Sequence, residues 1–228
     1  MAGGIGKRMG NTPLPKQFLK LGDKPIIIHT VEKFILNDKF DLILISTPEE
    51  YIEFTQDTLN KCNIKDDRIR AIAGGPERND TLENAIKYIE NTNGLKNDDA
   101  IVVHDAVRPF ITKKIIDENI KALRKFKSVD TVVPAYDTIV FGDGNEVSRI
   151  PIRDEMFIGQ TPQSFNIKTF QESFKKLSEE DKKTLSDSVK IVLLSGEKIG
   201  MVEGSHSNIK ITTPYDLDIA NAIIKVGH

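Results

Sequence analysis

Short apolar runs alternate with helical patterns along most of the chain. At residues 42–45 the apolar residues follow one another without alternating with polar ones, which is typical of a strand buried on both faces. The four short runs stand at residues 42–45, 69–73, 100–103 and 130–135. Between them, residues 47–50 carry a helix-start pattern, residues 81–89 place apolar side chains on one face, and Thr112 caps a further predicted helix. This alternation requires crossover connections and predicts an α/β fold: a Rossmann-like, mostly parallel sheet with helices on both faces.

Residues 138–152 interrupt this alternation. Two short strand patterns, at 138–141 and 147–150, flank the run Gly142-Asp143-Gly144-Asn145, which is typical of a tight turn. An isolated two-stranded hairpin is barely stable in water, so we expect this hairpin to be a dimerisation arm that packs on a second copy of the protein. The sequence contains no repeat, low-complexity tract or linker, and residues 1–228 are expected to form one domain.

The amino-acid composition excludes some classes of binding partner. A net charge of −2 provides no overall positive field for nucleic acid. No apolar run approaches the roughly 18–20 residues that span a bilayer. The single cysteine, Cys62, excludes an internal disulfide and argues for a reducing compartment. We therefore expect a cytoplasmic homodimer that binds neither nucleic acid nor membrane.

A glycine-rich turn followed by positive charge opens the sequence. Its small residues are Ala2, Gly3, Gly4 and Gly6, and the cations that follow are Lys7, Arg8 and Lys16. Unhindered N–H groups beside cations form a concavity for anions, of which a polyphosphate is the usual one, although a solvent-exposed turn is the alternative. The run matches neither the P-loop nor the dinucleotide fingerprint. Phosphate-binding turns in open sheets normally follow a strand, so we expect a strand upstream of Met1.

Two further segments end predicted strands at the edge where open sheets bind ligands. The first contains His104, Asp105 and Arg108. A lone aspartate there suits Mg²⁺, which takes one or two carboxylates and completes its shell with phosphate oxygens and water, whereas a purely structural Asp–Arg pair is the alternative. His104 is expected to be a packed strand residue. The second segment, at residues 74–79, leads in the same way from a strand into a helix.

The last part of the chain is less informative. Residues 207–211 are predicted to form a strand that leads into a helix with Pro214 in its first turn, and Lys210 alternates with apolar neighbours. The polar stretch at 159–163 indicates nothing by itself. The sequence shows no hydrolytic triad, H-E-x-x-H motif or paired cysteines, so a protease-like or zinc-dependent chemistry has no support.

Seven segments taken together resemble the family of cytidylyltransferases that act on polyol phosphates. In order they are AGGIGKRM, LPKQF, GGPERNDT, HDAVRPF, DTIV, GQTPQSF and NIKITTPYDL, and they cover nearly the whole chain. The family contains the 2-C-methyl-D-erythritol 4-phosphate enzyme of isoprenoid synthesis and the ribitol-5-phosphate enzyme of teichoic acid synthesis for the cell wall. The resemblance implies that an acceptor phosphate attacks the α-phosphorus of CTP and expels pyrophosphate, with Mg²⁺ as cofactor and a homodimer as the assembly.

The resemblance also implies a role for individual residues. The triphosphate is wrapped by Ala2, Gly3, Gly4, Gly6 and Lys7, and transition-state charge is neutralised by Arg8 and Lys16. The rest of the nucleotide is held by Gly75, Pro76, Glu77, Arg78, Asn79, Asp80, Thr81 and Ala106, with Asp105 at the Mg²⁺ position. The attacking phosphate is oriented by Arg153 and Lys210, in a pocket also lined by Arg108, Thr138 and Thr161. Thr138 reaches the neighbouring subunit's site on the arm.

Three departures from the family pattern bear on the acceptor. The methylerythritol branch usually carries a basic residue soon after the Asp-Thr pair, whereas Asp137-Thr138 is followed by Ile139-Val140. Gly159-Gln160 resembles the ribitol branch, and Pro76 stands where the erythritol branch often has an acid. The sequence therefore favours D-ribitol 5-phosphate, with methylerythritol 4-phosphate as the alternative.

Two other functions are weighed against these. A nucleotide-sugar glycosyltransferase would normally show an Asp-x-Asp signature, which His104-Asp105-Ala106 lacks. A catalytically inactive CTP-binding module is disfavoured by the cations and the acid that the chain retains, namely Arg8, Lys16, Asp105 and Lys210.

Overall fold

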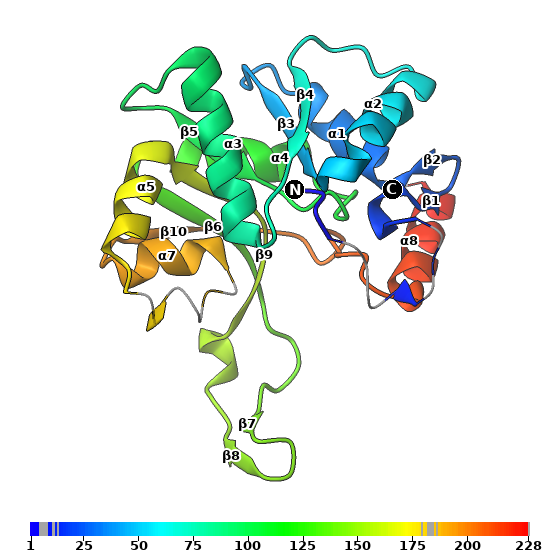
Figure 1. Ribbon diagram of the computed structural model, residues 1–228. Helices are drawn as coiled ribbons and strands as arrows, with labels where there is room; N and C mark the ends of the chain where they lie inside the picture. Colours follow the sequence, from blue (N-terminus) through cyan, green and yellow to red (C-terminus); the bar gives the residue numbers. More distant parts are fainter. Residues whose placement is uncertain are drawn as a thin grey trace.

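The computed structural model describes residues 1–4, 9–10, 12, 14–178, 180–181, 185 and 187–227. Two groups of strands lie at its centre (Figure 1). β3 (Ile43–Thr47) pairs in parallel with β4 (Ile69–Ala73). A four-stranded sheet has the order β10 (Ile199–Glu203), β6 (Ser128–Pro134), β9 (Phe157–Asn166) and β5 (Ala100–Val103). Only β9 runs against its neighbours in this sheet, so the predicted mixed α/β fold with mostly parallel strands is confirmed.

Helices connect the strands and cover both faces of the sheets. They are α1 (Ile26–Ile35), α2 (Ile52–Lys61), α3 (Arg78–Asn93), α4 (Lys113–Ala122), α5 (Ile167–Lys176), α7 (Ser188–Leu194) and α8 (Pro214–Val226). Short elements near the N-terminus are η2 (Lys16–Phe18), β1 (Lys20–Leu21) and β2 (Lys24–Pro25). None of the helices in the described part of the chain is long and apolar enough to cross a membrane.

Local sequence explains where several helices begin. The Thr112 side chain accepts a hydrogen bond from the Ile115 amide at the start of α4, as predicted. Pro214 occupies the first turn of α8, where its missing N–H costs nothing, and Thr213 and Asp216 form a capping box. The expected side-chain cap at residues 47–50 is wrong, because a 3₁₀ turn, η3 (Glu49–Tyr51), precedes α2 with no side-chain cap.

The strand predicted at residues 207–211 is wrong, and no sequence pattern indicated the strand that contains residues 159–163. Residues 207–211 form a loop, while the last strand is β10. The polar stretch at 159–163 lies inside β9, where its side chains are buried. Asn208 donates to the Thr161 carbonyl (2.9 Å) and to the Gln160 amide oxygen (3.1 Å), so side-chain hydrogen bonds hold the loop against β9. Because polar side chains at core positions find hydrogen-bond partners in this way, a search for apolar runs does not detect this core strand.

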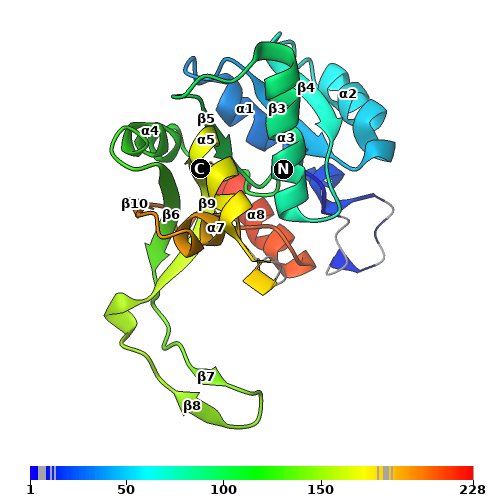
Figure 2. The same cartoon turned by 60° about the vertical axis from the view of Figure 1, so that its left-hand side comes forward.

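The segment between β6 and β9 leaves the body of the protein as a long arm (Figures 1 and 2). It carries β7 (Phe141–Gly142), β8 (Val147–Arg149) and the 3₁₀ turn η4 (Arg153–Glu155), so the hairpin is present with shorter strands than predicted. Apolar side chains stay exposed along it, including Val147 at 62% and Ile152 at 65%. Its packing on a second copy remains a prediction.

Candidate active site

A cavity of about 280 Å³ opens where β4 and β5 end, beside the N-terminal turn. The predicted site residues that line it are Ala2, Gly3, Gly4, Lys16, Gly75, Pro76, Glu77, Arg78, Thr81, Asp105, Ala106 and Lys210. They come from five separate segments of the chain, and the fold brings them together at the sheet edge that the sequence indicated. Gly6, Lys7 and Arg8 lie outside the described residues.

Asp105 is the electrostatic centre of this cavity. Its Oδ1 accepts a hydrogen bond from Arg78 Nη1 at 2.7 Å, and its Oδ2 lies 2.9 Å from Lys210 Nζ and 3.6 Å from Arg108 Nε. Burial of the carboxyl would raise its pKa, but the charges of Arg78 and Lys210 outweigh burial and hold the pKa of Asp105 well below its usual range. The site therefore contains one fixed anion that gathers three cations.

The Nε atoms of Arg78 and Arg108 are both buried, and neither has a hydrogen-bond partner among the described residues. The Arg108 guanidinium also donates to the Asn208 carbonyl at 2.7 Å, which fixes its orientation beside Asp105. Arginine presents several N–H donors in a rigid fork that matches phosphate oxygens. Both arginines thus keep donor capacity close to Asp105.

His104 is a packed residue, as predicted. Its ring contacts the Thr161 hydroxyl at 3.0 Å and the Arg108 carbonyl at 3.1 Å, and burial lowers its pKa to about 3. The ring is therefore neutral at physiological pH. Thr161 does not line the cavity; its hydroxyl accepts from the Asp105 amide (3.2 Å) and holds the backbone of that residue in place.

The turn from β4 into α3 requires glycine at position 75. The Gly75 amide donates to the Thr81 hydroxyl at 2.9 Å, and a Cβ on Gly75 would overlap Asp80. Asp80 and Glu77 form the capping box of α3, and Asn79 accepts from the Ser188 hydroxyl at 3.0 Å. Asn79 and Asp80, both predicted to bind nucleotide, thus have structural partners and lie outside the cavity lining.

The N-terminal turn is attached to the core by hydrogen bonds. Gln17 Nε2 donates to the Ala2 carbonyl at 2.6 Å, and Lys16 lies beside it in η2, only 9% exposed. Placing a lysine in so enclosed a position next to glycines favours recognition of an anion.

Two predicted residues lie away from the cavity. Arg153 and Thr138 are on the arm, and the Arg153 side chain is exposed, with its Nε 3.8 Å from Asp154. Within one chain the structure does not bring them to Asp105.

Sequence reasoning missed Gln163, which supports the site from β9. Its Oε1 lies 3.5 Å from Arg78 Nη2, and its Nε2 donates to Asp130 (3.0 Å) and to Asp187 (2.8 Å). Burial raises the pKa of Asp130 to about 6. No local sequence signal indicated this role, because amide and hydroxyl side chains such as those at 159–164 are also common in exposed loops.

The side chains around Asp105 determine whether the cavity can hold a metal ion. No group of three or more His, Cys, Asp or Glu side chains that could hold a metal occurs in the described ranges. The ionised carboxylate of Asp105 nevertheless fits Mg²⁺, because this ion keeps waters and binds through one or two carboxylates together with substrate phosphates.

The chain is similar to known proteins over nearly its whole length. A family model described as IspD, 2-C-methyl-D-erythritol 4-phosphate cytidylyltransferase, matches residues 1–226. The structure resembles 4-diphosphocytidyl-2C-methyl-D-erythritol synthase from Anaerococcus prevotii with a TM-score of 0.82 and 29% identity, over 98% of this chain and 93% of the other. The Francisella tularensis 2-C-methyl-D-erythritol 4-phosphate cytidylyltransferase gives a TM-score of 0.79 and 30% identity, over 97% and 95%. The Thermus thermophilus protein, at 23% identity and a TM-score of 0.71, shares the fold.

Proposed function

The chain belongs to the 2-C-methyl-D-erythritol 4-phosphate cytidylyltransferase family, and from this premise we propose that it transfers the cytidylyl group of CTP to 2-C-methyl-D-erythritol 4-phosphate. The observation that carries the proposal is the cavity in which the glycine turn, Lys16, Arg78 and Lys210 surround Asp105. Small residues give the triphosphate access to backbone, and the cations offset its charge.

The reaction is a substitution at phosphorus. An oxygen of the acceptor phosphate forms a bond to the α-phosphorus of CTP, the bond from that phosphorus to the β-bridging oxygen breaks, and pyrophosphate leaves. Such reactions depend on positioning and on stabilising charge at the phosphoryl oxygens. We assign Lys16 to the triphosphate of CTP and Arg78 to the nucleotide. Lys210 and Arg108, which both contact Asp105, are assigned to the acceptor phosphate.

Mg²⁺ would be held by Asp105 together with phosphate oxygens, and when bound it offsets negative charge on the triphosphate. The residues of this chain do the remaining work. The Thr161 hydroxyl holds the Asp105 backbone through a hydrogen bond, and Gln163 contacts Arg78 from β9. The neutral ring of His104 adds no charge to the site.

The identity of the acceptor rests on two opposing arguments. The family match and the similar structures support methylerythritol phosphate. The sequence favoured D-ribitol 5-phosphate, partly because of Gln160. The structure gives Gln160 another role, since its side chain donates to the Ser205 carbonyl (2.9 Å) and accepts from Asn208 (3.1 Å). Ile139-Val140 on the arm remains the observation that favours ribitol phosphate as the second candidate.

One experiment separates these alternatives: pyrophosphate release measured with CTP, Mg²⁺ and each polyol phosphate in turn. The expected result is turnover with methylerythritol 4-phosphate, and a kcat/KM for it at least about tenfold above that for ribitol 5-phosphate. A preference for ribitol 5-phosphate would transfer the assignment to that acceptor. CTP binding without turnover on either acceptor would favour the inactive binding module, and the absence of both CTP binding and pyrophosphate release would refute the proposal.

A further inference from the structure

Asn208 is a fully buried residue in the loop that joins β10 to α8, two residues before Lys210. Its Nδ2 donates to the Thr161 carbonyl at 2.9 Å and to the Gln160 side-chain oxygen at 3.1 Å. These two acceptors fix the orientation of the carboxamide, because an oxygen turned toward them would have no hydrogen to share. The Oδ1 atom is buried without a hydrogen-bond partner among the described residues, so the polar contribution of this side chain comes from the two bonds of Nδ2.

Gln160 holds the same loop from β9. Its Nε2 donates to the Ser205 carbonyl at 2.9 Å, which leaves Oε1 to accept the hydrogen bond from Asn208. The strand and the loop are in close contact here, since a Cβ on Gly204 would overlap the Gln160 side-chain oxygen. The path of the loop is therefore set by two carboxamides, one on the strand and one on the loop itself.

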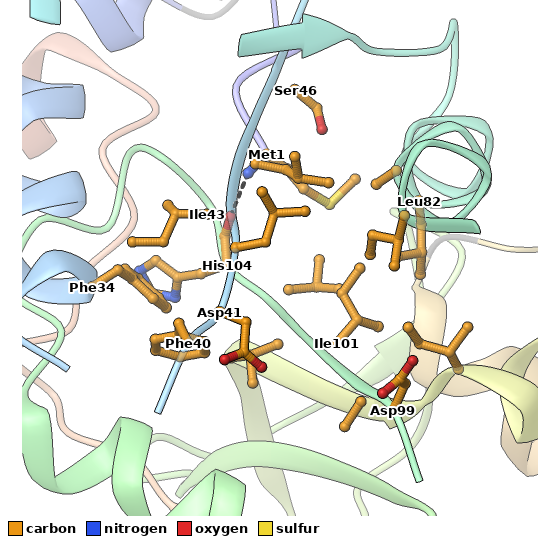
Figure 3. Close-up of a pocket in the computed structure, with 18 of the residues that line it drawn as sticks. Met1, Phe34, Phe40, Asp41, Ile43, Ser46, Leu82, Asp99, Ile101 and His104 are labelled. Atoms are coloured by element: carbon orange, nitrogen blue, oxygen red, sulfur yellow. Dashed lines mark hydrogen bonds between the residues drawn. The ribbon is translucent and has the colours of Figure 1, made fainter. Parts of the chain in front are cut away.

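The backbone carbonyl of Asn208 accepts a hydrogen bond from Arg108 Nη1 at 2.7 Å. The Arg108 backbone is held from another side: its carbonyl contacts the His104 ring at 3.1 Å, and that ring packs against Phe34, with ring centroids 5.3 Å apart, in the wall of the cavity drawn in Figure 3. The direction of the guanidinium is then set by the Asn208 carbonyl together with Asp105, whose Oδ2 lies 3.6 Å from Arg108 Nε. A displacement of Asn208 would therefore reorient the guanidinium without moving the Arg108 backbone.

Lys210 extends from the same loop. Its Nζ lies 2.9 Å from Asp105 Oδ2, although 38% of the side chain is exposed. The backbone around it is held on both sides, by Asn208 two residues before and by Ile211, which is fully buried and whose amide donates to the Val107 carbonyl at 2.9 Å. A lysine side chain is flexible and acts as a point charge, so the position of its ammonium group depends on where its backbone is held.

On the basis of the function proposed above, we propose that Asn208 is a positioning residue for the acceptor phosphate: through its carboxamide bonds to β9 it holds Arg108 and Lys210 in the geometry that receives this phosphate. Asn208 acts through these two cations, since it is fully buried and is not among the described residues that line the cavity around Asp105. One cation is bonded to its carbonyl, and the other follows it in the chain. Loss of the carboxamide therefore weakens binding of the acceptor and leaves the binding of CTP unchanged.

Asn166, the last residue of β9, provides a matched control. It is also buried, and its Nδ2 donates to two backbone carbonyls of a loop, those of Asn97 (2.8 Å) and Asp99 (3.3 Å). Asn208→Ala and Asn166→Ala therefore remove the same group and the same kind of bond, one beside the candidate site and one away from it. Both substitutions should lower Tm, because each deprives backbone carbonyls of a donor.

Steady-state kinetics with CTP, Mg²⁺ and methylerythritol 4-phosphate separate positioning from stability. Asn208→Ala should raise KM for the acceptor at least about tenfold, while the Kd for CTP stays within about threefold of the wild-type value. Asn166→Ala should change neither constant by more than about threefold. A loss of kcat with KM unchanged would overturn the proposal, because it is the result expected from a smaller fraction of folded protein. An equal rise of the acceptor KM in both variants would overturn it as well, because the effect would then not come from Arg108 and Lys210.

A second measurement reports the position of Lys210 without any substrate. Acetylation by an N-hydroxysuccinimide ester, read by peptide mass spectrometry, should modify Lys210 at least about threefold faster in Asn208→Ala than in the wild type, relative to the exposed Lys225, because the ion pair with Asp105 is weakened. If Asn208→Ala does not fold, Gln160→Leu, which removes one of the two acceptors of Asn208, should produce a smaller change in the same direction. Unchanged labelling of Lys210 in the folded variants would overturn the proposal. A wild-type chain without turnover would refute the proposed function instead, and the labelling would still decide whether Asn208 positions Lys210.

Discussion

Asp130 provides a direct test of the electrostatics behind the active site. Burial raises its pKa from 3.8 to about 6, with the neighbouring charge of Asp187 acting in the same direction. A carboxyl whose pKa is higher in the folded than in the unfolded protein binds its proton more tightly when folded. Its contribution to stability is therefore fully present below about pH 4 and is lost as the pH rises through about 6.

Replacing Asp130 by Asn removes the loss of stability that ionisation of Asp130 causes at high pH. A shift of about two pKa units corresponds to about 3 kcal/mol, and partial exposure of Asp130 to solvent reduces this to about 1–2 kcal/mol. The side-chain oxygen of Asn can still accept from Gln163 Nε2. Asp130→Asn should thus raise Tm by about 2–8 °C at pH 8 and leave it unchanged near pH 4.

The assay is thermal unfolding from pH 4 to 8, with Asp57→Asn as the matched control, since it removes the same charge from an exposed position on α2. The control should show no pH-dependent gain. A destabilised Asp130→Asn protein at pH 8 would refute the reasoning, because hydrogen bonding to the ionised carboxylate would then outweigh its burial. A gain independent of pH would also refute it, because the gain would then not come from removing the ionisation of Asp130.

Three further predictions concern the site and the arm. Lys210→Met should lower kcat/KM roughly 10²-fold or more in the pyrophosphate-release assay. The control Lys225→Met, at the exposed end of α8, should leave kcat/KM unchanged, and equal effects of the two substitutions would exclude a specific role of Lys210 at the site. Gly75→Ala should lower the free energy of unfolding in urea by about 1–3 kcal/mol because its Cβ would meet the backbone that starts α3, whereas Gly3→Ala, with open space around it, should not. The wild-type chain should sediment as a dimer at micromolar concentration, and Ile150→Asp on the exposed arm should sediment as a monomer; a monomeric wild type would contradict the predicted role of the arm.

The sequence predicted strands that are mainly apolar and a helix with a clear cap. β4 and β5 have the predicted bounds, and Thr112 caps α4 as expected, because in these segments local propensity and burial point the same way. β9 was not predicted because its core positions hold amides and hydroxyls. These become acceptable in a core only through partners that are distant in the chain, such as Asn119 for Ser164 at 2.9 Å. No local pattern contains that information.

The sequence identified the residues of the candidate site better than it predicted the contacts between them. Asp105, Arg78 and Lys210 were each identified, but with Arg78 assigned to the nucleotide and Lys210 to the acceptor phosphate. The structure shows both in contact with the same carboxylate. A pairing between residues 105 and 210 depends on how the loop after β10 returns to the end of β5, and this is a property of the whole fold.

The contacts of Asp105 also explain how three cations can lie close together at this site. Arg78, Arg108 and Lys210 would repel one another if no anion stood between them, and Asp105 supplies that anion within the protein. A carboxylate oxygen accepts more than one hydrogen bond, so Asp105 can keep these cations in place and still offer a lone pair to a metal ion. Under the proposed function, phosphates that enter the cavity would meet Arg78 and Lys210, which line it, while Arg108 stays between Asp105 and the Asn208 carbonyl. The arrangement is thus preorganised: the cations are oriented by Asp105 in advance, and binding of the phosphates adds contacts without requiring the cations to be gathered from solvent.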